Sequence, residues 1–151
     1  MATGIVVKLE DEGDDVAQLL RDAQRSLSRA LADRIGGHGV TIGQWYFLRA
    51  LWEEDGLTQR ELSQRVGMME PTTVAALNGM ERRNLVRRVR NTRDRRKINI
   101  HLTEKGSALR KTLMPFEDEV NELAVEGLSG GEREALQKAL YQVVRNLSDR
   151  R

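Results

Sequence analysis

Residues 57–103, LTQRELSQRVGMMEPTTVAALNGMERRNLVRRVRNTRDRRKINIHLT, contain the pattern that decides the fold. The stretch begins with two short helical segments joined by a turn, and it ends with two alternating strands around a polar tip. Residues 82–97 hold nine Lys or Arg and one acid, a net charge of +8 in a chain whose total is +2. The remainder therefore sums to −6. Positive charge concentrated in this way is typical of a nucleic-acid contact.

The first helical segment has strong end signals. Thr58 and Glu61 have the spacing of a capping box, and the leucines that flank them fit a hydrophobic staple. Gly67 is a stop signal for this helix. Glu70 and Pro71 then begin the next helix, because proline is favoured in its first turn and an acid suits its positive end.

The second helical segment has two different sides. The inner side carries Thr73, Ala76, Leu77 and Met80, and the outer side carries Pro71, Thr72, Ala75, Asn78 and Arg82. A helix, a short glycine turn and a helix with a small, polar outer face form the arrangement that places a recognition helix in a major groove.

A β-hairpin is predicted directly after this helix pair. Val86 and Val89 mark its first strand, and the second strand alternates polar residues with Ile98, Ile100 and Leu102. Its tip, residues 91–96, contains no apolar residue. A run of charges is usually a solvated face. Because this run follows a helix-turn-helix pattern, we instead expect its arginines to reach a narrow minor groove.

The segments on either side of residues 41–103 are predicted to be long amphipathic helices, over about 14–36 and 104–149. Pro115 is expected to bend the second segment, and Ser129 with Glu132 forms a capping box inside it. None of these helices can bury its apolar stripe well alone, so pairing across a two-fold axis is expected. Residues 1–13 are polar and are expected to be adaptable.

The helix predicted after Thr41 is the most aromatic part of the chain, with four of the six aromatic residues within eight positions. One interpretation is a core helix. The other is that some of these rings form the wall of a small-molecule site, with an arginine to meet an anion. The residues of that second interpretation are His38, Trp45, Tyr46 and Arg49, and His38 could equally be an ordinary loop residue.

The composition excludes several classes of protein. The chain has 151 residues and no cysteine, so disulfides and thiol redox sensing are excluded. Two histidines and no clustered acids argue against a metal site, and no catalytic set or cofactor motif is present. No secretory signal or apolar run of about 20 residues is found, so we expect a cytoplasmic protein without a membrane partner.

These motifs resemble the MarR family (multiple antibiotic resistance regulator type) of winged helix-turn-helix transcription factors. The resemblance rests on residues 57–62 and 67–68, on the helix-to-strand junction 81–86, and on the wing motif Asp94-Arg95-Arg96 followed by residues 102–106. The resemblance covers about residues 14–147. It implies a mainly α fold with a small β-hairpin wing and long N- and C-terminal dimerisation helices, in one domain over 1–151. The family often has glycine where Asn84 lies and a basic residue where Ala75 lies.

The resemblance also implies a homodimer that binds a palindromic operator in double-stranded DNA, with Asp94 orienting Arg96 for the minor groove. The residues expected at the DNA are Pro71, Thr72, Thr73, Ala75, Asn78, Arg82, Arg90, Arg93, Asp94, Arg95 and Arg96. The expected function is a repressor released by a small organic ligand, an aromatic acid or thioester, rather than an enzyme. The alternative is an architectural DNA-binding protein without an effector.

Overall fold

The structure is a computed structural model that describes residues 15–150, so the expectation for residues 1–13 lies outside it. Six α-helices, a short 3-10 turn and two strands follow one another in these residues. Their order is α1 (Val16–Ile35), the 3-10 turn η1 (Gly36–His38), α2 (Ile42–Glu53), α3 (Gln59–Val66), α4 (Glu70–Arg82), β1 (Val86–Arg90), β2 (Ile98–Leu102), α5 (Glu104–Ala124) and α6 (Gly130–Ser148). This mainly α fold with one hairpin confirms the predicted class.

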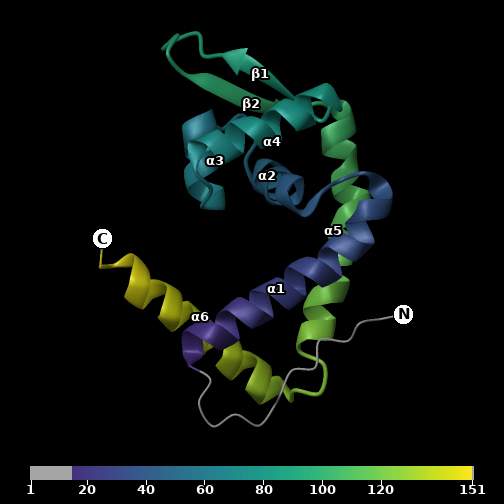
Figure 1. Ribbon diagram of the computed structural model, residues 1–151, viewed down its shortest axis with the longest axis vertical. Helices are drawn as coiled ribbons and strands as arrows, with labels where there is room; N and C mark the ends of the chain where they lie inside the picture. Colours follow the sequence, from purple (N-terminus) through teal and green to yellow (C-terminus); the bar gives the residue numbers. More distant parts are fainter. Residues whose placement is uncertain (1–14, 151) are drawn as a thin grey trace.

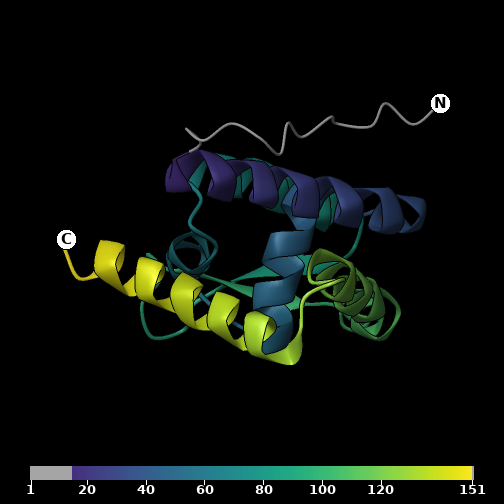
Figure 2. The same cartoon turned by 90° about the horizontal axis from the view of Figure 1, so that it is seen from below.

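The elements lie in two groups (Figure 1). Helices α2, α3 and α4 cluster beneath the β1–β2 hairpin, while α1, α5 and α6 extend away from them. Helix α5 begins beside the hairpin and runs the length of the molecule, so it connects the two groups. Seen from below, α1 and α6 form two separate long rods (Figure 2).

The helix starts are fixed by the caps that the sequence predicts. The Thr58 hydroxyl accepts from the Glu61 backbone N–H at 3.2 Å, and the Glu61 carboxylate accepts from the Thr58 backbone N–H at 2.9 Å. Reciprocal boxes of the same kind begin α2 at Thr41 and α6 at Ser129. Each box satisfies two backbone donors that a helix start leaves unpaired. Gly67 ends α3 in the left-handed conformation, with φ at 74°.

Helix α2 lies at the centre of the core. Its buried residues are Trp45, Phe47, Leu48, Ala50, Leu51 and Trp52. Side chains from α1, α3, α4, the hairpin and α5 join the same apolar cluster. The interpretation of the aromatic segment as a core helix is therefore confirmed for most of its rings.

The hairpin is tied to the segment that precedes α3. Strands β1 and β2 pair antiparallel, with Val86 opposite Leu102 and Arg90 opposite Ile98. On its other side, the Ile100 backbone N–H donates to the Leu57 carbonyl at 2.8 Å. The Asn99 side chain donates to the Gly56 carbonyl at 2.8 Å. The hairpin is therefore held to the helix-turn-helix by backbone bonds as well as by packing.

The junction between the hairpin and α5 depends on Gly106. The Trp52 indole N–H donates to the Gly106 carbonyl at 2.9 Å. A Cβ atom at Gly106 would stand 2.1 Å from the carbonyl oxygen of Leu85, which leads into β1. Just before this point Asn84 has φ at 56°, a left-handed conformation that asparagine tolerates better than most residues. Only glycine allows α5 to approach the start of the hairpin this closely.

The terminal helices leave apolar side chains exposed. Helix α6 has no buried residue, and Leu136, Leu140 and Leu147 are exposed along the stripe that the sequence predicts. Val16 and Leu19 of α1 are exposed as well. Among residues 15–150, no helix combines the length and the apolar character needed to cross a membrane.

We expect Gly106→Ala to destabilise the protein by about 1–3 kcal/mol, because the added methyl must displace backbone rather than a flexible side chain. Urea unfolding followed by circular dichroism measures the change. Gly131→Ala is the matched control, since a Cβ there meets no atom within 4 Å. Equal stability of the two variants would contradict the close approach at Gly106.

Candidate nucleic-acid interface

Most residues on the outer side of helix α4 are exposed to solvent. The exposed residues on it include Pro71, Thr72, Ala75, Asn78 and Arg82, while Leu77 and Met80 are fully buried on the opposite side. The turn between α3 and α4 is closed by the Gly67 backbone N–H, which donates to the Ser63 carbonyl at 2.9 Å. The helix pair therefore holds α4 by one side and leaves the other free, as the sequence pattern predicts.

Thr73 does not belong to this outer face, which corrects its predicted place at the DNA. Its side chain is fully buried. Its hydroxyl accepts from the Ser63 hydroxyl at 2.7 Å and donates to the Met69 carbonyl at 3.2 Å. The hydroxyl thus both accepts and donates inside the protein, and it joins α4 to α3. Because the side chain is fully buried, Thr73 cannot contact a base edge.

The wing tip is organised by two side chains. The Asn91 side-chain oxygen accepts from the backbone N–H groups of Arg93 and Asp94, each at 2.9 Å. The Asp94 carboxylate then holds the Arg96 guanidinium in a two-point contact, at 3.0 Å from Nε and 3.1 Å from Nη2. The Arg96 side chain remains 90% exposed, so it is oriented without being buried.

The contact between Asp94 and Arg96 shifts the pKa values of both side chains. Hydrogen bonds from the Arg96 side chain and backbone lower the pKa of Asp94 below its ordinary value. The same pair raises the pKa of Arg96. Asp94 therefore stays ionised and Arg96 stays charged at neutral pH. Arg90, Arg93 and Arg95 are exposed around them, so the tip is strongly positive.

Arg88 has a structural role that the sequence analysis did not assign. The sequence predicts it only as one of the charges in residues 82–97, but its side chain turns inward onto α4. Nη1 donates to the Asn78 side-chain oxygen at 2.7 Å, and Nη2 donates to the Val74 carbonyl at 3.3 Å. The Glu81 carboxylate lies 3.8 Å from Nη1. The alternation of strand faces along β1 could have predicted this role, because residue 88 lies on the same face as buried Val86.

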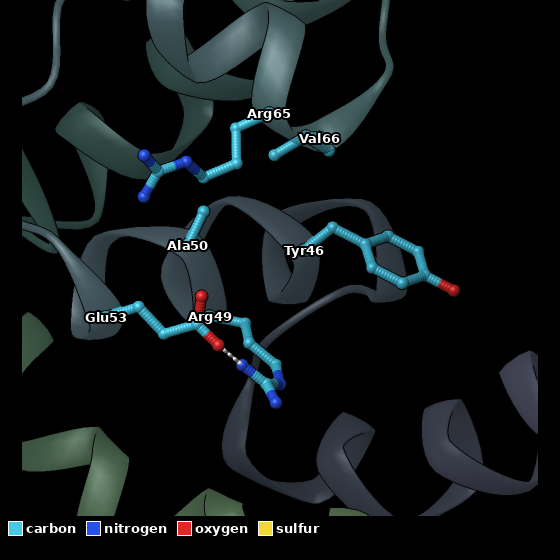
Figure 3. Close-up of a pocket in the computed structure, with 6 residues that line it drawn as sticks. All are labelled: Tyr46, Arg49, Ala50, Glu53, Arg65 and Val66. Carbon is cyan, nitrogen blue, oxygen red and sulfur yellow. Dashed lines mark hydrogen bonds and ion pairs between the residues drawn. The ribbon is translucent and has the colours of Figure 1, made fainter. Parts of the chain in front are cut away.

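The residues predicted to form a small-molecule site are only partly brought together. A hollow of about 210 Å³ is lined by Tyr46, Arg49, Ala50, Glu53, Arg65 and Val66. Figure 3 shows Ala50 facing Arg65 and Val66, with the Tyr46 ring extending to one side. Trp45 is buried at 1% exposure and packs edge-on against Trp52. His38 lies outside the hollow, with its ring 5.4 Å from that of Phe116.

Arg49, predicted to meet an anion, is already engaged by two acids, so an anion that binds it must compete with them. Its Nε donates to both Glu117 carboxylate oxygens at 2.8 Å, and its Nη1 pairs with Glu53. The bond to Glu117 is the main reason that the pKa of Arg49 is raised. This pair joins α2 to α5. Within residues 15–150, no group of three or more potential metal-binding side chains is present.

Comparisons with known proteins agree with this geometry. A model of the MarR family matches residues 38–97, which run from the loop before α2 to the wing tip. The chain is 34% identical over 88 residues to the regulator TtmR of Methylorubrum extorquens, a match covering 58% of this chain and 45% of that protein. It is 26% identical over 141 residues to the organic hydroperoxide resistance transcriptional regulator of Bacillus subtilis, covering 93% and 92%.

A solved structure shows that the likeness extends through the whole fold. The chain superposes on Staphylococcus aureus MepR, in its complex with DNA, with a TM-score of 0.82 at 25% identity. The match covers 89% of this chain and 99% of that one. The described fold and these relatives indicate transcriptional regulation rather than enzymatic activity. The matching family model, these relatives and the superposed fold together support a MarR-family winged helix-turn-helix transcriptional regulator.

Proposed function

We propose that the protein is a homodimeric repressor that recognises a palindromic operator and is released from it by a small organic ligand. In this proposal the chain works as one unit, in which residues 41–103 contact DNA and residues 14–36 and 104–149 form the dimer. One observation carries the proposal. The exposed outer face of α4 and the arginine-rich wing are held together by the contact of Arg88 with Asn78, so they can meet DNA as one surface.

The two parts of this module have different tasks. Residues 82–97 carry a net charge of +8, which attracts phosphates and makes affinity fall steeply with salt. Base edges in the major groove are then distinguished by the exposed side chains of α4. Ala75 can offer only apolar contact, so the wing and the shape of the minor groove supply part of the specificity. Arg96, preset by Asp94, is the residue best placed for that groove.

The dimer in this proposal is formed by the terminal helices. Leu136, Leu140 and Leu147 of α6 are exposed along one stripe, as are Val16 and Leu19 of α1. Covering these side chains with the equivalent helices of a second copy removes apolar surface from water. A two-fold axis would also place the two copies of α4 in successive major grooves, about 34–36 Å apart.

The effector step in this proposal acts at the contact between α2 and α5. Arg49 and Glu53 line the hollow, and Glu117 from α5 is bound to Arg49. An aromatic acid that places its carboxylate on Arg49 would compete with Glu117 and loosen α5 from α2. A tenfold loss of operator affinity needs only about 1.4 kcal/mol of coupling. Because the chain has no cysteine, thiol oxidation cannot supply this signal.

The first test measures binding to the DNA upstream of the gene for this protein and to scrambled DNA of the same length. We expect preference for the upstream DNA, a linear fall of log affinity with log salt, and loss of the preference with one aromatic acid or coenzyme A thioester. Equal affinity for both DNAs, unaffected by every compound, would instead identify an architectural protein.

Arg96→Ala tests the wing. We expect it to weaken specific operator binding by about 1–3 kcal/mol. The melting temperature should not change, because the side chain is 90% exposed. Arg29→Ala, an exposed arginine on α1 away from the wing, removes the same charge and serves as control (Figure 1). Unchanged operator binding by the Arg96 variant would contradict the proposed role of the wing.

Leu140→Asp tests the dimer. The substitution places a charge in the exposed stripe of α6, so we expect monomers in sedimentation equilibrium and loss of operator binding. Gln142→Asp adds a charge to the same helix on a different face and should leave the dimer intact. A stable, fully active Leu140→Asp dimer would exclude α6 from the interface.

A further inference from the structure

Asn78 lies on the exposed side of α4, but one half of its amide is already occupied. Its side-chain oxygen accepts from Arg88 Nη1 at 2.7 Å. Arginine has N–H donors only and no acceptor, so the amide oxygen rather than the amide nitrogen must face it. The NH₂ group therefore faces away from Arg88, and within residues 15–150 it donates to no protein atom.

The orientation of Arg88 is itself fixed from several directions. Nη2 donates to the Val74 carbonyl, one turn before Asn78 on the same helix. The Glu81 carboxylate, one turn after Asn78, accepts from the Arg88 backbone N–H at 3.2 Å. The Arg88 side chain is only 20% exposed. A rotation of the Asn78 amide would place its NH₂ against the guanidinium donors, so the amide is held in one orientation.

We propose that Arg88 is a positioning residue that orients the Asn78 amide so that its NH₂ group, rather than its oxygen, is presented to the DNA. A free asparagine pairs with adenine at two points, because it accepts from N6 and donates to N7. With its oxygen turned toward Arg88, Asn78 presents its NH₂ group outward, so donation is the contact that its orientation favours. The base edge that suits this best is guanine, which presents O6 and N7 as acceptors, and the least suitable is cytosine, which presents a donor. The inference rests on the proposed operator binding through α4.

The test measures base preference rather than affinity alone. The tightest operator is selected from a random DNA pool, and each base pair of one half-site is replaced in turn. Binding is compared for the wild type, Asn78→Ala, Arg88→Met and Arg87→Met. The preference that Asn78→Ala abolishes identifies the position that Asn78 contacts. At that position we expect the wild type to prefer guanine over cytosine by about tenfold.

Arg88→Met keeps most of the apolar stem but removes the donors, so the amide of Asn78 is free to rotate. We expect adenine at the identified position to bind at least as well as guanine, with no change of preference elsewhere. Arg87→Met is the matched control, because it removes the same charge from the neighbouring exposed position of β1. It should weaken binding to every sequence by a common factor.

Asn78→Asp is a second variant at an exposed position, so it decides the question even where Arg88→Met fails to fold. One carboxylate oxygen accepts from Arg88 and the other faces outward as an acceptor, which reverses the preference to cytosine over guanine. A wild-type preference for adenine at this position, the same profile for Arg88→Met and Arg87→Met, or guanine preference retained by Asn78→Asp would each overturn the inference. A wild type that discriminates no sequence overturns the proposed operator binding and the inference together.

Discussion

One buried contact at the start of α5 fixes how the core helix, the hairpin and the long connecting helix are joined. The Trp52 indole N–H of α2 donates to the Gly106 carbonyl at the start of α5, while the missing side chain of Gly106 lets the Leu85 carbonyl approach from the entry to β1. The core helix, the hairpin and the long connecting helix therefore meet at a single point. Because close-packed contacts of this kind tolerate little change of shape, the relative positions of α2, the start of α5 and the entry to the hairpin are fixed together.

Two arginines of the hairpin, Arg88 and Arg96, have different structural roles. Arg88 is turned inward and joins β1 to α4 through Asn78 and Val74. Arg96 is 90% exposed, and its guanidinium is held by Asp94. An exposed ion pair contributes little to folding stability, so the main effect of the Asp94 contact is to orient the guanidinium. The inward arginine makes helix and wing one body, and the outward arginines give that body its positive surface.

Local signals in the sequence predicted most of the fold, because caps and periodicity act within a few residues. The boxes at Thr58, Thr41 and Ser129 begin helices as predicted. Periodicity placed Thr73 on the inner side, and only the family resemblance moved it to the DNA, where its burial now excludes it. Arg49 and Arg88 each bind a partner that is distant in the sequence, Glu117 at 68 residues and Asn78 at 10 residues. Such pairings depend on tertiary packing, which a count of charges does not contain.

In the proposed complex, α4 and the wing contact DNA together, as one body, in each half of a two-fold arrangement. Hydroxyl-radical footprinting on the selected operator tests it most directly. We predict two protected segments with centres about 10 base pairs apart, or a multiple of that spacing, each flanked by protection in the adjacent minor groove. In the Arg96→Ala variant the flanking protection should disappear while the central segments remain. Uniform protection along the DNA, or loss of both kinds of protection together, would contradict the account.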